Sequence, residues 1–348
     1  MKIFKYVIAL LVILMLSHTV VAEEITKIGK NRFGTNTTKL TSSVASGKIV
    51  SITSAENLSG KLTIKATESN QATFAFYKTL KTASKSDAIE YARVINVVLE
   101  ETTNGVNLIL QAPNPAPWSG TDNSGVISGE LEIPKNSKIN INAQYFDLKI
   151  TGPFGAVENT SSFGRAEIEG ISGVLNLATT NQDIIVNNIN GEVNLSTSHA
   201  DIELNNIVSS ERPANIQNEN GTVTGDNLSG IFDIKNSFGR IRLSGITLLS
   251  DKSRISGSYC SINLRINGIN KGGLTVRNTN EDIKVFVPES LAAEFSLRVD
   301  NNGEIDVEGL EIKPMLVEHS RLDFETKDGG PRIRMSVRGD GNISIRGN

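Results

Sequence analysis

A short motif recurs about every twenty residues through the second half of this 348-residue chain. Each copy begins with a turn, followed by an apolar residue, one spacer and usually a second apolar residue. The first apolar position is occupied in turn by Ala166, Ile184, Ile202, Val223, Ile241, Ile262, Ile283, Ile305 and Ile343. The intervals between these residues are 18, 18, 21, 18, 21, 21, 22 and 38. Because the last interval is so long, it should hold one long copy or two degenerate ones.

The motif predicts strands, since apolar and polar residues alternate over three to five positions. A second alternating segment precedes most copies, as in Leu175 and Leu177 or Val193 and Leu195. Propeller blades repeat at roughly 40 residues or more, and a sandwich has no reason to repeat its sequence. A stack of coils does repeat, because every coil must present the same inward row. The sequence therefore predicts an all-β chain with a β-solenoid or β-helix-like stack.

The turn of each copy favours particular residues three positions before the first apolar one. These are Phe163, Asn181, His199, Asn220, Phe238, Tyr259, Asn280, Asn302 and Asp340. Asn and Asp tolerate the left-handed backbone region best, and stacked coils would let like side chains form ladders. His199 is therefore expected to be a ladder member and not a metal ligand.

Four regions are predicted along the chain. Residues 1–22 resemble a secretory signal peptide, with Lys2 and Lys5 ahead of an apolar run and small residues before Glu23. Residues 23–47 form a polar segment that is expected to be partly ordered. Residues 48–125 form a smaller, mostly β region, and residues 126–348 form the stack. We expect an exported protein of the periplasm or cell surface with no transmembrane segment in its mature chain.

The region before the stack is expected to hold one short helix. Residues 86–93 begin with a candidate N-cap and contain helix-favouring residues. Strands are predicted at residues 48–53, 61–66 and 72–78. An Asn104–Gly105 turn predicts a hairpin between residues 95–101 and 106–112.

Composition excludes several classes of function. The formal net charge is −3, with no basic face for phosphate backbones, so nucleic acid is not an expected partner. The single cysteine, Cys260, cannot form an internal disulfide, which leaves a buried thiol or an intermolecular bond. With three histidines in all, no metal site and no cofactor are expected.

Charged residues in the repeats have both a structural and a chemical interpretation. Asp183, Asp201 and Asp282 each stand one residue before an apolar position. They could form a calcium ladder or a lyase acid cluster, but Asp fills this position in only three copies, so turn residues that pair with neighbours are favoured. Four arginines alternate with apolar residues near the C-terminus: Arg332, Arg334, Arg338 and Arg346. A solvated strand face is favoured for them over a basic stripe that binds an anionic polymer.

Trp118 lies in a Pro-rich loop over residues 113–125. Exposed between prolines, its indole could contact a sugar or a partner protein. It could instead close the end of the stack, which needs a cap against edge-to-edge pairing, and this interpretation is favoured. Trp118 is the only candidate binding residue, and no catalytic residue is assigned.

Residues 129–348 resemble a family of bacterial β-strand-repeat domains of unknown function that are catalogued as candidate adhesins. The matching pieces are Ile133 and Pro134 at a strand end, the repeats at 180–189 and 198–207, and the Gly-Gly-Pro tail at 329–348. Residues 48–112 match more loosely. The chain differs in having Asn or His where the family often has Gly before the strand. The resemblance implies a scaffold and supplies no active-site residues.

The sequence therefore predicts a non-enzymatic, adhesin-like envelope scaffold that binds a protein or a glycan. The alternative is a polysaccharide lyase or hydrolase on a β-helix. That alternative requires a groove with several acids and a basic residue from neighbouring coils.

Overall fold

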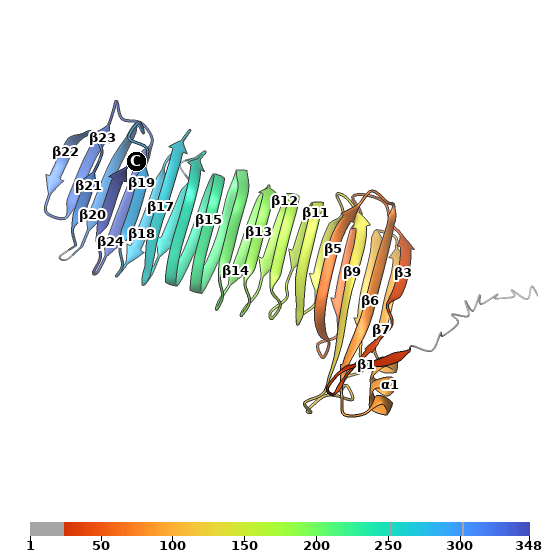
Figure 1. Ribbon diagram of the computed structural model, residues 1–348. Helices are drawn as coiled ribbons and strands as arrows, with labels where there is room; N and C mark the ends of the chain where they lie inside the picture. The colour runs from red at the N-terminus through yellow and green to blue at the C-terminus, as the bar shows by residue number, and fades with distance from the viewer. Residues whose placement is uncertain (1–23, 251, 301–302) are drawn as a thin grey trace, which may run out of the picture.

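A computed structural model describes residues 24–250, 252–300 and 303–348. The chain forms a long stack of strands, with a wider N-terminal region at one end (Figure 1). The predicted signal peptide lies outside the described residues. The all-β class is confirmed. Within the described residues the one helix is α1 (Lys85–Val94), where Ser84 caps the first turn by accepting a hydrogen bond from the Asp87 N–H at 3.1 Å.

Strands occupy most of the N-terminal half. They are β1 (Ile25–Gly29), β2 (Arg32–Thr35), β3 (Thr38–Ser43), β4 (Ile49–Ser54), β5 (Ser59–Thr67), β6 (Gln71–Lys81), β7 (Asn96–Thr102), β8 (Gly105–Gln111), β9 (Ser124–Pro134), β10 (Lys138–Asn142), β11 (Phe146–Asn159), β12 (Ala166–Ala178), β13 (Ile184–Asn190) and β14 (Glu192–Thr197). The polar segment 23–47 was expected to be only partly ordered. It instead contains β1, β2 and β3, because β2 and β3 both pair with β6.

The C-terminal half continues with one long winding strand and ten shorter ones. They are β15 (Ile202–Leu248), β16 (Ser253–Gly257), β17 (Cys260–Ile269), β18 (Leu274–Thr279), β19 (Ile283–Val287), β20 (Ala293–Val299), β21 (Ile305–Glu308), β22 (Ile312–Glu318), β23 (Arg321–Thr326), β24 (Arg332–Arg338) and β25 (Ile343–Gly347).

Two ladders of parallel strands run the length of the stack. Ladder A pairs β8, β4, β10, β11, β12, β14, β15, β16, β18, β24 and β20 in that spatial order. Ladder B pairs β9, β5, β11, β12, β13, β15, β17, β19, β25 and β21. β11, β12 and β15 turn a corner and contribute to both ladders. We call one level of this stack a rung.

The repeat determines the register of ladder B. Ala166, Ile184 and Ile202 are successive partners, as are Ile241, Ile262 and Ile283. All of these residues are at most 1 % exposed. Ile305 is only half-buried, because β21 is the last strand of its ladder. The inward orientation of the apolar positions is therefore confirmed, and both ladders contribute to one hydrophobic cluster.

Buried polar side chains line the corner where ladder A ends. Asn218 and Asn278 donate from Nδ2 to the carbonyls of Ala200 and Cys260, each at 2.9 Å. Thr197 and Thr179 join their hydroxyls at 3.2 Å. Since a buried backbone carbonyl without a partner is costly, these side chains satisfy carbonyls that the tight corner leaves unpaired.

The strands at both ends of the stack are out of sequence order. β4 and β5 lie between β8 and β9 on one side and β10 and β11 on the other. The last strands of the chain, β24 and β25, lie between β18 and β19 on one side and β20 and β21 on the other. The parallel ladders thus extend further toward the N-terminus than the repeat, which was recognised only from residue 155.

Antiparallel strands cover the two ends. At the N-terminal end β6 pairs with β9 and β7 pairs with β8, which confirms the predicted hairpin. At the other end the 38-residue interval contains a β22–β23 hairpin that pairs with β20. The outermost strand, β22, carries Pro314 beside a register shift. Proline and irregular register both hinder pairing with a further strand.

We expect Ile202→Asp to lower the free energy of unfolding by roughly 3–5 kcal/mol, since it buries a charge without a partner. Urea unfolding followed by circular dichroism measures the change. Ile185→Asp is the matched control, because Ile185 lies half-buried on the outer side of the adjacent strand. Equal stability of the two variants would contradict the inward assignment.

We expect a chain that ends at residue 328 to lose amide-exchange protection in β18 and β19. It lacks β24 and β25, which pair directly with both strands. In the control, a short Gly/Ser linker replaces residues 312–326, so that only the covering hairpin is lost. Retained protection in β18 and β19 after truncation would show that the inserted rung is dispensable.

Candidate functional site

A row of asparagines lies on the outer face of ladder A. Asn176, Asn194 and Asn215 are successive partners on three rungs. Asn194 donates to Asn176 Oδ1 at 2.8 Å, and Asn215 donates to Asn194 Oδ1 at 2.7 Å. The apolar residues on both sides of each asparagine point inward, so the asparagines themselves face outward, where all three are half-buried. We call these three residues, with Ser196 and Gln217 beside them, the amide strip.

The amide strip lines a shallow hollow of about 540 Å³. Ala178 adds exposed apolar surface to its lining, whereas Leu177 and Leu195 are only 2 % exposed and belong to the core. An amide carbonyl has two lone pairs, and an amide nitrogen has two hydrogens. After the bonds within the row, the carbonyls keep accepting capacity toward solvent. The strip can therefore bind hydroxyl-rich ligands, and it offers no nucleophile or acid–base pair.

The positions of the amide strip were present in the sequence but were not assigned. Asn176 and Asn194 are the spacers of the predicted strands Leu175–x–Leu177 and Val193–x–Leu195. Aligning the spacers instead of the apolar positions would have revealed the row.

Other asparagine rows have a structural role. Asn188, Asn206 and Asn227 have φ angles of 57°, 55° and 54°. Asn206 donates to Asn188, and Asn227 donates to Asn206. Asn tolerates this left-handed conformation better than most residues, so these residues are explained by the turn. A separate pair, Asn187 and Asn205, joins on the outer face of ladder B at 3.0 Å.

The carboxylates that could have formed a calcium ladder are used in backbone hydrogen bonds. Asp183 accepts from the Asp201 N–H at 3.1 Å, and Asp201 accepts from the Thr222 N–H at 2.7 Å. Asp282 accepts from the Asn342 N–H at 2.8 Å. The prediction that these residues pair with their neighbours is confirmed. Within the described residues, no group of three or more His, Cys, Asp or Glu side chains is placed to hold a metal ion.

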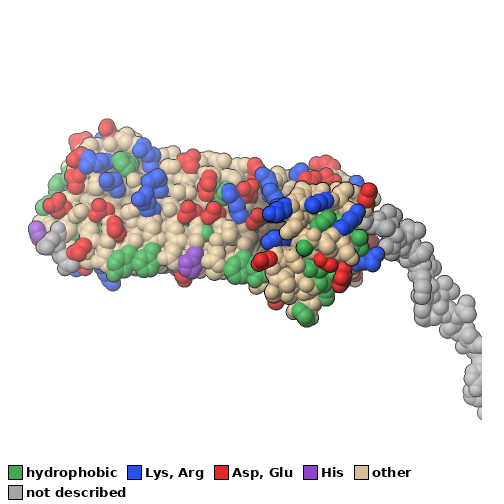
Figure 2. All heavy atoms as spheres, turned by 60° about the horizontal axis from the view of Figure 1, so that its bottom comes forward, with side chains coloured by type: hydrophobic (Ala, Val, Ile, Leu, Met, Phe, Trp, Pro, Cys, Tyr) green, Lys and Arg blue, Asp and Glu red, His purple; other side chains and the backbone are tan. Residues whose placement is uncertain are grey.

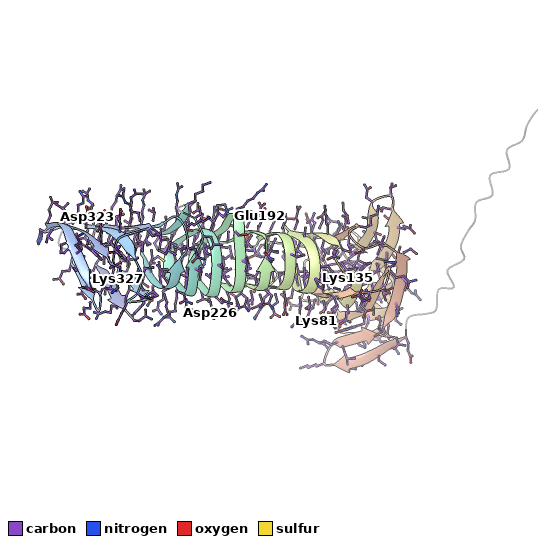
Figure 3. All side chains as sticks on the ribbon, turned by 90° about the horizontal axis from the view of Figure 1, so that it is seen from above. Lys81, Lys135, Glu192, Asp226, Asp323 and Lys327 are labelled. Atoms are coloured by element: carbon purple, nitrogen blue, oxygen red, sulfur yellow. The ribbon has the colours of Figure 1, made fainter. Side chains whose placement is uncertain are left out.

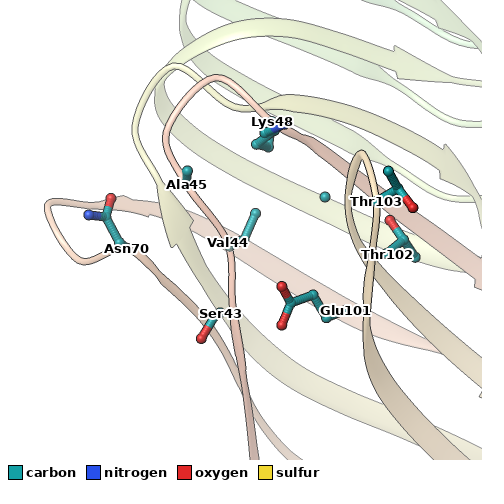
Figure 4. Close-up of a pocket in the computed structure, with 9 residues that line it drawn as sticks. Ser43, Val44, Ala45, Lys48, Asn70, Glu101, Thr102 and Thr103 are labelled. Atoms are coloured by element: carbon teal, nitrogen blue, oxygen red, sulfur yellow. The ribbon is translucent and has the colours of Figure 1, made fainter.

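A second hollow of about 540 Å³ lies at the N-terminal end, beside the β7–β8 turn (Figure 4). Its lining includes Glu101, Lys48, Asn70 and Thr102. Glu101 is the only carboxylate among the lining residues. Glycoside hydrolysis ordinarily uses two carboxylates that flank the glycosidic bond. The lining of this hollow supplies only one of them.

Aromatic residues form stacked pairs at the turn position. The rings of Tyr145 and Phe163 are 5.1 Å apart, and those of Phe238 and Tyr259 are 5.7 Å apart. Figure 2 shows exposed hydrophobic side chains at intervals along this edge of the stack, with a histidine between them. His199 is exposed at the same turn position, and its N–H donates to the Thr180 carbonyl. Stacking of turn side chains is thus confirmed for the two aromatic pairs, and the ladder role of the His199 side chain stays a prediction.

Trp118 is not an exposed loop residue. It is 6 % exposed, its Nε1–H donates to the Asn57 carbonyl at 3.0 Å, and its ring meets Tyr91 of α1 edge-on at 5.4 Å. A partner could reach the indole only by displacing the Pro-rich loop. The ring therefore joins this loop to the helix. This burial agrees with the favoured interpretation of Trp118 as a closing residue and not with an exposed indole, and a role of Trp118 in partner binding stays a prediction.

The four C-terminal arginines do not share one face. Arg346 lies in ladder B and pairs with Asp306 and Glu308, whereas Arg332, Arg334 and Arg338 lie in β24 of ladder A. Arg332 pairs with Glu294 at 2.9 Å. The single stripe considered from the sequence is thus divided, because the turn between β24 and β25 carries the chain from one ladder to the other.

An ion pair lies on β23, the antiparallel strand that pairs with β20 at the end of ladder A. Arg321 contacts Asp323 Oδ2 at 2.6 Å. Partial burial opposes ionisation of Asp323, but hydrogen bonds from Arg321 and Ser296 hold its pKa below the ordinary value. The charge of Asp323 is therefore already compensated within the chain.

Cys260 is a buried thiol, as favoured from the sequence. It is fully buried, and Asn236 Nδ2 lies 3.5 Å from its Sγ. Burial raises the pKa of this thiol to about 11, although the contact with Asn236 acts in the opposite direction.

No family model and no curated protein matches this sequence. The similar solved structures are mostly bacterial candidate adhesins, all at low TM-scores. A candidate cell adhesion protein from Clostridium sporogenes aligns over 90% of this chain and 100% of its own, with 10% identity and a TM-score of 0.22. A candidate adhesin from Parabacteroides merdae aligns over 89% and 95%, with 10% identity and a TM-score of 0.29.

A third similar structure has a different description. It is a candidate lipid binding protein from Parabacteroides distasonis, which aligns over 89% of this chain and 96% of its own, with 14% identity and a TM-score of 0.23.

The part of the chain that the structure describes contains no helix with the length and hydrophobicity needed to span a membrane.

We expect Cys260 to resist thiol reagents in the folded protein at pH 8. With a pKa of about 11, roughly one thiol in a thousand is ionised at that pH, and burial blocks access to it. Ellman's reagent measures the rate before and after denaturation. The control is Phe238→Cys in a Cys260→Ser background, which places a thiol at an exposed position. Equal rates for the two thiols would contradict the burial of Cys260.

Proposed function

We propose that this chain is a non-enzymatic, adhesin-like β-solenoid scaffold that binds an extended glycan along the amide strip. The single observation that carries the proposal is the hydrogen-bonded row of Asn176, Asn194 and Asn215 on consecutive rungs. Successive rungs are about 4.8 Å apart, so the row repeats the same donors and acceptors at a spacing suited to a repeating polymer.

The rigidity of the scaffold supports the same function. Each amide lies between inward apolar residues on a paired strand, so little side-chain freedom remains to be lost on binding. Ala178, an exposed apolar residue, lines the hollow beside the polar atoms. A sugar ring, with apolar faces and polar edges, is complementary to such a mixture.

The proposed location is the periplasm or the cell surface. It is supported by the N-terminal sequence, in which a basic start precedes an apolar run and small residues. An extended polysaccharide is an available partner in either compartment.

The enzymatic alternative, a lyase or hydrolase, has less support. Asp183, Asp201 and Asp282 are each hydrogen-bonded to a backbone N–H of the neighbouring rung. The hollow that contains Glu101 has no second carboxylate in its lining.

We expect the double variant Asn194→Ala/Asn215→Ala to lose roughly tenfold in affinity for its glycan, because it removes two hydrogen-bonding groups. Retention on immobilised cellulose, mannan, galactan and peptidoglycan glycan strands identifies the polymer first. Titration with soluble fragments then gives the affinity.

The matched control is Asn187→Ala/Asn205→Ala on ladder B. Asn205 bonds Asn187 and Glu203 much as Asn194 bonds Asn176 and Glu192. Retention of none of these polymers, or equal losses in the two double variants, would refute the proposal. Release of new sugar ends by the intact protein would establish the enzymatic alternative instead.

A further inference from the structure

We propose that the outer face of ladder A from β15 to β20 binds an extended polysaccharide that carries a carboxylate on each sugar. The surface consists of two neighbouring columns that hold one basic residue on each of five consecutive rungs. We call it the cationic strip. Arg332, which pairs with Glu294, and Arg338 lie on either side of these columns in β24. None of the residues of the cationic strip belongs to the amide strip, so an experiment can disprove binding at one of the two sites without bearing on the other.

The cationic strip has two outward columns. From rung to rung the residues of the two columns are Asp233 and Lys235, Arg254 and Ser256, Thr275 and Arg277, Arg334 and Ser336, and Ser296 and Arg298. The basic residue changes column at every rung, and a short hydroxyl side chain takes the other column on four of the five. The result is a zigzag of positive charge along the outer face of ladder A.

The insertion of β24 completes the zigzag. Arg334 lies beside Thr275 on one side and Ser296 on the other, although β18 and β20 are neighbours in sequence. Without β24, Arg277 and Arg298 would belong to successive rungs of the same column. Like charges directly opposite each other repel, and the alternation avoids this.

The three central arginines are not neutralised within the described residues. Arg254, Arg277 and Arg334 are exposed, and no described carboxylate forms an ion pair with them. Both flanks are compensated, since Lys235 lies 3.6 Å from Asp233 and Arg298 lies 3.7 Å from Asp300. Positive charge is therefore concentrated on three adjacent rungs of a chain whose formal net charge is −3.

The geometry favours a ribbon-like acidic polysaccharide. In an extended chain whose sugars are each turned by half a turn, successive carboxylates point to alternate sides, as the cations do here. Guanidinium groups bind carboxylates through two parallel hydrogen bonds. Ser256, Thr275 and Ser336 offer hydroxyls to the sugars between the charged groups. In contrast, the outward columns present no large apolar side chain that would enter a membrane.

The test uses oligomers of β-1,4-linked mannuronate, which form such a ribbon, with cellohexaose as an uncharged chain of similar shape. We expect the full mature protein to bind the mannuronate oligomer with an affinity that falls as salt is added. Arg254→Gln/Arg277→Gln/Arg334→Gln should weaken this binding roughly tenfold. Arg254→Lys/Arg277→Lys/Arg334→Lys should retain part of the binding. Lysine keeps the positive charge but cannot form the two parallel hydrogen bonds of a guanidinium group.

The matched control is Arg240→Gln/Arg242→Gln/Arg265→Gln on ladder B, which removes the same charge from the opposite ladder. Unchanged binding by this control supports the cationic strip. Equal losses in the two triple variants, or equal binding of cellohexaose, would overturn the proposal. Tighter, arginine-dependent binding of duplex DNA or phosphatidylglycerol vesicles would also overturn it, since the partner would then be of another class.

Discussion

Parallel stacking of rungs is the constraint on which the structure depends. In a parallel ladder each residue lies above its equivalent in the neighbouring rung, so an inward position within the strands must stay apolar from one rung to the next, and polar side chains are buried only where they find hydrogen-bond partners. Ile184 between Ala166 and Ile202 is one example, and all three are fully buried. A side chain that fits badly at one rung would disturb two neighbours. This is why the interior repeats while the surface does not.

The same constraint creates demands at corners and ends. Corners leave carbonyls without strand partners, and Asn218 and Asn278 satisfy them from inside the stack. The ends leave open strand edges, which the chain covers with antiparallel strands and a proline-bearing outermost strand. In addition, the chain places its final rung inside the stack, so that β18 and β20 are held together by the last residues.

The outward side chains do not have to repeat from rung to rung, and their chemical character changes along the ladders. On ladder A, an amide row on β12, β14 and β15 gives way to alternating cations from β15 onward. Figure 3 shows how Glu192 of ladder A and Asp323 of β23 project from one side of the stack, whereas Asp226 of ladder B projects from the other. A stack of this kind presents its side chains at regular intervals, and the proposed recognition of a repeating polymer depends on this spacing and not on a deep cavity.

The sequence by itself determined the all-β class, the inward rows and the short helix, because each depends on local periodicity or capping. It also indicated that Cys260 is buried and that Asp183 and Asp201 pair with neighbours. It left two interpretations of Trp118 open, because the burial of this residue depends on contacts with Tyr91 and Asn57 far along the chain. It also could not give the order of the rungs at either end. Strand pairing across long separations is decided by which edges remain open once the others have paired, and only the tertiary structure contains that information. For the same reason, the zigzag of Arg254, Arg277 and Arg334 exists only in the folded chain.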